Sequence, residues 1–372
     1  MPKIEPQFII PFAKPSGITS FTSLWQVKHA LGTKKVGHTG TLDSFADGLL
    51  VLLSGKLTKL VPYITDFDKT YRVLFYFGKE TDTLDPAGTV IDEKPLPMYA
   101  DFIAAIKRLT GTIEQVPPVY SAVKQAGERL SDKIRRGEAV SAPPRTVTIY
   151  SIDIEEIFYE EAIALSADIA GGDKAAIHAD SADMDNVSVD RLEAANDKTV
   201  AGAVLCVRCS KGTYIRSLVR DIAHRCGSAA YVYALRRTTV GPFTLEQAVG
   251  FSALPPFRNA AAHAVDADST DMPSCCANSA TVPHSVTDDA IKQAALPLIE
   301  TLARVMHFQT AALKEQYYAS FMNGKPISKH WFTSAQPLSD GGTVVVFYEG
   351  CCVGLMTKNG NRFHYEAVFN QG

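Results

Sequence analysis

In KKVGHTGTLDSFADGLLVL, at residues 34–52, a glycine-flanked loop presents Asp43 and leads into an unbroken apolar run at residues 49–53. The run is long enough for a buried strand or helix segment. Gly37 and Gly40 permit backbone angles that bulkier residues resist. We therefore expect Asp43 to lie firmly at the edge of the core, where catalytic and binding groups are usually presented. The loop alone is equally compatible with a turn that an aspartate caps.

Charge is unevenly distributed along the 372 residues, whose net charge is −3. The segment from Glu160 to Lys198 carries −7 and the segment from Asn259 to Ile291 carries −5, which leaves +9 on the rest of the chain. A basic remainder favours long-range attraction to phosphates. We interpret the acidic segments as a surface insertion at about 160–200 and a linker or second insertion at about 255–295.

Composition predicts a cytoplasmic protein without a membrane partner. No segment approaches the roughly 18 to 20 apolar residues of a membrane span, and the N-terminus lacks the features of a signal peptide. Seven cysteines, an odd number, argue for a reducing compartment. Cys206 and Cys209 form a CxxC, but no second CxxC or nearby His pair completes a zinc site. No metal and no organic cofactor are predicted.

Apolar periodicity predicts a helix at FTSLWQVKHALG, with Leu24, Val27 and Leu31 on one face and either Ser20 or Thr22 as its cap. A second helix is predicted at GTYIRSLVRDIAHRCG and a third at about residues 288–306. Stretches such as YRVLFYFGKET and TVTIYSIDI are typical of strands. Since helices and strands do not alternate regularly, the fold class is a mixed α+β and not a doubly wound parallel sheet.

The end of the chain reads as strands and turns, in GGTVVVFYEG, CCVGLMTKNG and RFHYEAVF. This pattern predicts a small, mostly β C-terminal domain. The expected organisation is a catalytic domain at 1–254, a linker or insertion at 255–295, and the small domain at 296–372.

The motif GHTGTLD, at residues 37–43, resembles the signature of the TruB-type tRNA pseudouridine synthases. Further blocks of the family follow in the same order: KPSGITS (14–20), KTYRV (69–73), TDTLDPAGTV (81–90), PPVYSAVKQAG (117–127), CSKGTYIRSLVRD (209–221) and LRRTTVGPF (235–243). The resemblance spans about residues 10–250. It implies a pseudouridine synthase fold, with a bent, mainly antiparallel central sheet and flanking helices, and a PUA-like RNA-binding module at the C-terminus.

The resemblance also implies three catalytic residues. Asp43 matches the nucleophile of the isomerisation, in which the uridine N1–C1′ bond breaks and C5 joins C1′. Two routes stay open: covalent attack by Asp43 on the sugar or base, or removal of a sugar proton to give a glycal. Tyr71 matches the tyrosine that packs against the flipped base and can take part in removing the C5 proton. Arg216 matches the arginine that pairs with the aspartate and aims it.

Contacts with RNA are implied by the same resemblance. His38 matches the histidine that helps to hold the RNA loop open, with a loop-stabilising hydrogen bond as the alternative. Further RNA contacts are expected at Lys14, Lys69, Tyr214, Leu235 and Arg236. Other candidate phosphate contacts near the motifs are Lys34, Lys35, Lys124, Arg129, Arg145, Lys211 and Arg237, and for any single one of them a solvated surface charge is the safer interpretation. Arg220 is expected to be a solvated arginine.

The implied substrate is uridine at position 55 in the T-loop of tRNA, taken out of its stack by base flipping. A monomer that needs no guide RNA is expected. Two rival hypotheses are an RNA-guided catalytic subunit of a small-nucleolar-type particle, and a tRNA-binding module that assists folding.

Some positions depart from the family or have a plainer interpretation. The segment ERLSDKIRRGE replaces the usual YxxAR-like helix, and Ser44 replaces the proline that usually follows the aspartate. We expect Ser44 to alter loop stiffness and not chemistry. Asp82 and Asp85 resemble a carboxylate pair, but DPAG favours a turn role for both.

Overall fold

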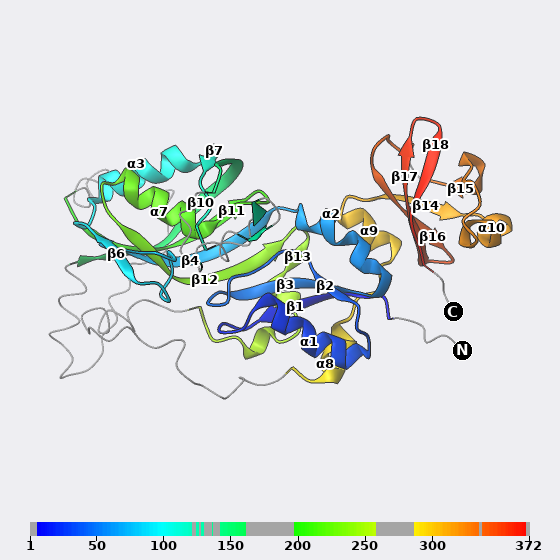
Figure 1. Ribbon diagram of the computed structural model, residues 1–372, viewed down its shortest axis with the longest axis horizontal. Helices are drawn as coiled ribbons and strands as arrows, with labels where there is room; N and C mark the ends of the chain where they lie inside the picture. Colours follow the sequence, from blue (N-terminus) through cyan, green and yellow to red (C-terminus); the bar gives the residue numbers. More distant parts are fainter. Residues whose placement is uncertain are drawn as a thin grey trace, which may run out of the picture.

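Figure 1 shows the computed structural model, which describes residues 6–120, 124–125, 128–129, 136, 142–160, 197–257, 286–334 and 337–369. Most of the two acidic segments, and most of ERLSDKIRRGE, lie outside these residues. The predictions made for those segments therefore stay predictions.

The described chain is built around a nine-stranded sheet. Its strands are β1 (Ile9–Lys14), β2 (Val36–His38), β3 (Asp47–Ser54), β4 (Lys69–Phe77), β7 (Gly111–Gln115), β10 (Arg145–Tyr159), β11 (Val200–Cys209), β12 (Ala230–Val240) and β13 (Phe243–Thr244). The order is β1-β3-β12-β4-β11-β10-β7, with β2 beside β3 and β13 beside β12. All of these pairs are antiparallel except β12 with β3. The predicted α+β class is confirmed.

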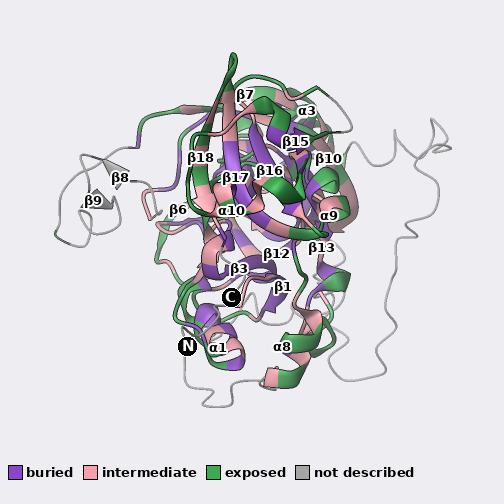
Figure 2. Cartoon of the chain, turned by 90° about the vertical axis from the view of Figure 1, so that its right-hand side faces the viewer, coloured by how far each residue is buried: buried purple, intermediate pink, exposed green. Residues whose placement is uncertain are grey.

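The apolar run at 49–53 lies within β3, whose eight residues are all buried. Because side chains alternate along a strand, this burial requires packing on both faces. Leu49 and alternate residues after it join a cluster that reaches the C-terminal part of the chain, whereas Leu50 and Leu52 pack with residues of the first helix. Figure 2 shows β1, β3 and β12 as the buried centre of the molecule. The strand after the Asp43 loop is thus fixed from both sides.

Helices cover the faces of this sheet. They are α1 (Ser20–Leu31), α2 (Val61–Thr65), α3 (Tyr99–Leu109) and α7 (Ile215–Arg225), with short 3₁₀ turns η1 (Gly55–Leu60), η3 (Leu245–Gln247) and η4 (Phe251–Ala253). Figure 1 shows α3 and α7 side by side over one part of the sheet. The apolar stripe of α7, including Ile215, Leu218 and Ile222, is buried in the largest apolar cluster, as its spacing predicts.

The cap of α1 differs from the prediction. Thr19 caps the helix, since its Oγ1 accepts a hydrogen bond from the Thr22 N–H at 3.0 Å. Ser20 is the first helical residue, and its hydroxyl instead contacts the backbone of Leu42. Gly32 ends the helix in the left-handed conformation, with φ of 60°, as predicted.

Two small hairpins complete the larger part of the chain. One joins β5 (Lys79–Thr81) to β6 (Val90–Glu93), and the other joins β8 (Lys124–Gln125) to β9 (Glu128–Arg129). The first is the hairpin expected at TDTLDPAGTV.

The C-terminal part forms a separate five-stranded sheet in the order β15-β14-β16-β17-β18. Its elements are β14 (Gln309–Leu313), η6 (Glu315–Tyr317), α10 (Tyr318–Met322), η7 (Lys329–Trp331), β15 (Phe332–Thr333), β16 (Thr343–Tyr348), β17 (Cys351–Asn359) and β18 (Arg362–Val368). The three predicted strands are β16, β17 and β18. Along β16, Val344 and Val346 face a core of this sheet's own, whereas Val345 and Phe347 join the cluster that contains Leu49. The expected mostly β C-terminal domain is present.

The single helix expected at 288–306 is two helices, α8 (Asp288–Ala294) and α9 (Glu300–Val305). Pro297 has no N–H to donate and disfavours a helical residue before it. Leu296 instead exchanges two backbone hydrogen bonds with Ile9, at 2.8 and 2.9 Å. Tertiary pairing with β1 therefore interrupts the helix.

Helix α8 falls inside the predicted linker and packs on α1 through the buried side chain of Ile291. The domain bounds at 254 and 296 stay predictions. No helix in the described part of the chain is long and apolar enough to span a membrane.

We predict that Gly48→Ala destabilises the fold by several kcal/mol. Gly48 has φ of +109°, and an added Cβ would lie 2.7 Å from the Arg237 nitrogen and closer still to the Arg237 carbonyl oxygen. Urea unfolding followed by circular dichroism measures the loss. Gly111→Ala is the matched control, because φ is +107° and nothing lies within 4 Å of the added atom. Equal losses in the two variants would show that only the backbone angle matters.

Candidate active site

The loop between β2 and β3 carries Asp43 and is tied to the chain segment before α1. Ser20 Oγ accepts from the Leu42 N–H at 2.8 Å and donates to the Leu42 carbonyl at 3.0 Å. The Gly17 N–H donates to the Ser44 carbonyl at 2.8 Å. Leu42 is also buried in the largest apolar cluster. Asp43 is thus flanked by two anchored residues, while its own side chain stays 35% exposed.

Arg216, in the first turn of α7, faces Asp43 with one edge of its guanidinium. Nη2 donates to Asp43 Oδ1 at 3.1 Å, and Nε lies 2.9 Å from Oδ2. The Arg216 side chain is only 4% exposed. A buried guanidinium in this two-point arrangement fixes the orientation of a carboxylate. The predicted pairing of Arg216 with Asp43 is therefore found in the structure.

Asp85 is a second carboxylate on the same guanidinium. Arg216 Nη1 donates to the Thr83 carbonyl at 2.7 Å and lies 3.4 Å from Asp85 Oδ2. Asp85 also accepts from the Thr83 hydroxyl and from the Ala87 N–H, which is the expected turn role. Burial raises the pKa of the Asp85 carboxyl above its usual range, while Thr83 and Arg216 oppose the rise. The turn interpretation was incomplete, because folding brings this turn against α7.

For Asp82, the contacts described fit the predicted turn role and no other. Its Oδ1 accepts from the Thr89 N–H at 2.9 Å across the hairpin.

Tyr71 lies in the third position of β4, in the same apolar cluster as Leu42 and Leu235. Burial raises the pKa of the Tyr71 phenol above its usual range, and the charge of Arg237 and its hydrogen bond with the phenol oppose the rise. The phenol is therefore protonated at neutral pH. It presents a ring and a hydroxyl, not a phenolate, to whatever reaches Asp43.

Arg237 was grouped with the candidate phosphate contacts, but it is 1% exposed. Its guanidinium donates to the carbonyls of Leu49 at 2.8 Å, Gly40 at 3.2 Å and Thr41 at 3.5 Å. A phosphate role does not fit this burial. Arg237 instead joins β12, β3 and the first half of the Asp43 loop.

The other expected RNA contacts are mostly turned inward. Lys14 Nζ donates to the carbonyls of Pro15 and Ile18 at 3.0 and 2.7 Å and lies 3.4 Å from that of Ser44. Lys69 Nζ donates to the carbonyls of Thr65, the last residue of α2, and Phe67, each at 2.6 Å. Desolvation lowers the pKa of both lysines from 10.5 to about 8.

Arg236 makes two hydrogen bonds of 2.7 Å to Asp47, and Leu235 is 5% exposed. The expected RNA contacts of Lys14, Lys69, Leu235 and Arg236 stay predictions. Their present contacts are structural.

His38 and Tyr214 are partly exposed, unlike the buried lysines and arginines above. The Gly40 N–H donates to His38 Nδ1 at 3.4 Å, which is the loop hydrogen bond named as the alternative to an RNA role. Desolvation, and then the charge of Arg237, lower the pKa of His38. Tyr214 precedes α7 and is held through its backbone by Gln115, with Arg145 over its ring at 5.8 Å. Both rings stay candidates for RNA contact.

Arg220 is not a solvated arginine. Its side chain is 17% exposed, and it pairs with Asp221 and donates to the Val116 carbonyl.

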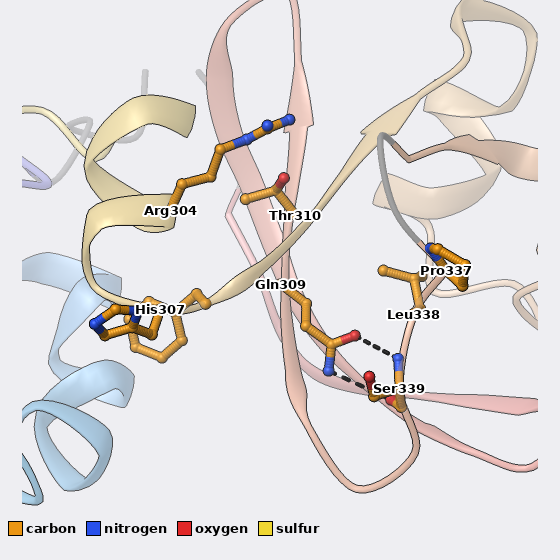
Figure 3. A pocket seen from close by; sticks show the side chains of 8 residues that line it. Arg304, His307, Gln309, Thr310, Pro337, Leu338 and Ser339 are labelled. Atoms are coloured by element: carbon orange, nitrogen blue, oxygen red, sulfur yellow. Dashed lines mark hydrogen bonds between the residues drawn. The ribbon is translucent and has the colours of Figure 1, made fainter.

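A separate open hollow of about 370 Å³ lies at the start of the C-terminal part (Figure 3). It is lined by Arg304, His307, Phe308, Gln309, Thr310, Pro337, Leu338 and Ser339. The amide of Gln309 bonds to both backbone groups of Ser339. The hollow does not include the residues around Asp43. In the described part of the chain, no group of three or more His, Cys, Asp or Glu is placed to hold a metal ion.

Sequence reasoning missed the roles of Asp85 and Arg237. One signal was available for Arg237: two successive arginines in a strand point to opposite faces, so one of them has to face the interior of a covered sheet. No comparable signal existed for Asp85, because its contact with Arg216 joins residues 131 positions apart.

The chain is similar to known proteins over almost its whole length. The description "TruB family pseudouridylate synthase (N terminal domain)" matches residues 28–173. A tRNA pseudouridine synthase B of Treponema pallidum is 42% identical over 374 residues, covering 98% of each chain. The Treponema denticola protein of the same name is 37% identical over 98% of this chain and 99% of its own. A Pseudomonas fluorescens relative is 38% identical over 66% of this chain and 68% of its own.

Solved structures show the same fold at low identity. A structure titled as a Cbf5-Nop10-Gar1 complex matches 98% of this chain and 85% of its own with a TM-score of 0.56 and 19% identity. A box H/ACA Nop10-Cbf5 complex matches with a TM-score of 0.55 and 19% identity. The fold and its relatives define a pseudouridine synthase, an isomerase. The chain belongs to the TruB family, as its motifs predict.

We predict that Arg237→Lys lowers the rate of pseudouridine formation about 100-fold while RNA affinity stays within about twofold of wild type. A lysine cannot reach the three carbonyls together, so the first half of the Asp43 loop loses its fixed position. Single-turnover assays and filter binding separate the two quantities. Arg208→Lys, on an exposed side chain of β11, is the control and is expected to behave as wild type. A lower Tm with an unchanged rate would refute a positioning role.

Burial of Lys14 gives a pH-dependent prediction. The pKa is about 8 in the folded chain and 10.5 in the unfolded chain, so the unfolded chain binds more protons between these values. The free energy of unfolding therefore rises with pH across this window, by about 3 kcal/mol if it is crossed completely. Lys14→Met removes this group. We expect wild type to gain stability relative to Lys14→Met between pH 8 and 10, measured by urea unfolding. If the difference in free energy of unfolding between wild type and Lys14→Met does not change with pH, the lowered pKa of Lys14 is contradicted.

Proposed function

We propose that the protein isomerises uridine to pseudouridine in the T-loop of tRNA, at position 55, with Asp43 as the nucleophile. The observation that carries this proposal is the two-point contact of Arg216 with Asp43 on an anchored loop. The names of the relatives that match 98% of the chain support tRNA as the substrate.

Asp43 is the exposed member of an otherwise buried group, so the reaction site is open on one side only. A uridine in a helical stack cannot bring C1′ to this carboxylate, and the nucleotide has to be flipped out. The N1–C1′ bond then breaks, the base turns, and C5 bonds to C1′. The proton that leaves C5 is replaced by one at N1, so no redox partner and no group donor are needed. Both the covalent route and the glycal route fit this geometry.

Tyr71 has a defined part in this scheme. Its raised pKa keeps the phenol protonated, which favours packing of the ring against the flipped base before any proton transfer. Arg216 holds the carboxylate while the base turns, and Asp85 and the Thr83 carbonyl hold Arg216. The network thereby limits movement of Asp43 between the breaking of the N1–C1′ bond and the formation of the C5–C1′ bond.

The proposal includes a monomer that acts in the cytoplasm without a guide RNA. An RNA-guided mode gains no support from the matches to the Cbf5 and H/ACA complexes, since these are 18–19% identical and show the fold alone. A role in assisting tRNA folding is compatible with catalysis. The experiment below distinguishes the two roles, because it measures tRNA binding and pseudouridine formation separately.

We predict that Asp43→Asn lowers pseudouridine formation at least about 1,000-fold and leaves tRNA affinity nearly unchanged. The purified protein is incubated with unmodified tRNA transcript and no guide, and pseudouridine is mapped with carbodiimide. One new pseudouridine in the T-loop is expected for wild type. Asp66→Asn, on an exposed loop acid, is the control and is expected to retain full activity. If Asp43→Asn forms pseudouridine at the wild-type rate, Asp43 is not the nucleophile. If the wild-type protein binds tRNA but forms no pseudouridine, only the role in assisting tRNA folding is left.

A further inference from the structure

Helix α1 exposes two large aromatic side chains on one face. Phe21 is 72% exposed and Trp25 is 67% exposed, the highest values among the large apolar side chains of the described residues. They are four positions apart and so lie one helical turn from each other. The opposite face of α1, with Leu24 and Val27, is buried. The fold therefore does not need Phe21 and Trp25 for its core.

Each of these rings is paired with a basic side chain of the same helix. Lys28 Nζ lies 5.4 Å from the centroid of the Phe21 ring. Trp25 stacks on His29, with centroids 5.6 Å apart and an interplanar angle of 18°. His29 Nδ1 contacts Asp288 Oδ2 at 2.9 Å, which marks the acidic border of this surface. We call Phe21, Trp25, Lys28 and His29 the α1 aromatic face.

The chain segment that carries the α1 aromatic face is basic. No Asp or Glu occurs between Pro6 and Leu42, whereas this stretch has four lysines. Lys34 and Lys35, directly after the helix, are exposed. Aromatic rings beside lysines match the chemistry of unpaired nucleotides, whose bases stack and whose phosphates attract cations. Asp288 and Asp289 of α8 limit this surface on the side of His29.

The α1 aromatic face is continuous with the active site. Ser20, the residue before Phe21, bonds to both backbone groups of Leu42, the residue before Asp43. Figure 1 shows α1 on the side of the sheet formed by β1, β2 and β3, and the Asp43 loop connects β2 to β3. An RNA that brings a flipped uridine to Asp43 therefore brings its neighbouring nucleotides close to the first turn of α1.

We propose that the α1 aromatic face is a stacking platform for an unpaired nucleotide of the substrate RNA next to the flipped uridine, with Lys28, Lys34 and Lys35 contacting its phosphates. This inference rests on the proposed function, because it takes the substrate to be an RNA loop. It assigns to Phe21 and Trp25 a role in binding and none in the chemical step.

Fluorescence tests the platform without measuring activity. The chain has two tryptophans, and Trp331 is 7% exposed, so most of the fluorescence open to acrylamide quenching comes from Trp25. We expect saturating tRNA to reduce the acrylamide quenching constant of the full-length protein at least about twofold, by covering Trp25. Trp25→Phe reports the contribution of Trp331 and is expected to show no such change. Undiminished quenching of Trp25 in the saturated complex would overturn the proposal.

Affinity provides the second test. Phe21→Ala and Trp25→Ala are each expected to weaken tRNA binding about tenfold, the effect of losing one base–aromatic stack, with kcat unchanged at saturating tRNA. Trp25→Phe is expected to restore affinity, which a purely electrostatic surface would not explain. Val305→Ala removes an apolar side chain that is 50% exposed on α9 and is expected to bind as wild type.

The two proposals fail in different ways. If wild type binds tRNA with Trp25 covered but forms no pseudouridine, the platform stands and the proposed function is refuted. If wild type forms pseudouridine while Phe21→Ala and Trp25→Ala bind tRNA with wild-type affinity, the platform is refuted and the face serves another partner.

Discussion

Arg237 lies where β12, β3 and the loop that carries Asp43 meet, and its guanidinium donates to carbonyls of both neighbours. Backbone carbonyls in a buried irregular loop have no ladder partner, and leaving one unpaired costs about 1–3 kcal/mol. The close approach of Gly48 to the Arg237 backbone brings the guanidinium within reach. The position of Asp43 depends on this junction.

Lys14 contacts the loop on the other side of Asp43, where its ammonium group lies near the Ser44 carbonyl. The loop is therefore bracketed by two buried cations, while a third, Arg216, contacts the carboxylate itself. Burying a charge without partners is strongly unfavourable. Lys14 and Arg237 are tolerated because several carbonyls share each charge, and Arg216 because Asp43 and Asp85 face it. Stability and catalytic geometry rest on the same contacts.

Sequence reasoning succeeded where a residue's role depends on its neighbours along the chain. The helix that carries Arg216 and the three C-terminal strands follow from local periodicity. The hairpin after Tyr71 follows from the family resemblance, and the apolar run after the loop is compatible with either a strand or a helix until the sheet is known. It failed where a distant segment changes the outcome. Pairing of Leu296 with Ile9 divides a predicted helix, and a buried sheet turns Arg237 from a surface cation into an internal anchor.

The sequence by itself determined the family and the mixed α+β class, and it singled out Asp43 as the candidate nucleophile, because ordered motifs and apolar periodicity are local and additive signals. Only the tertiary structure decided which charges are internal and which are free to meet RNA. Lysines and arginines have the same formal charge wherever they lie, and burial depends on what packs over them from elsewhere in the chain. Asp85 reaches Arg216, and Lys14 is enclosed, only after segments far apart in the sequence come together.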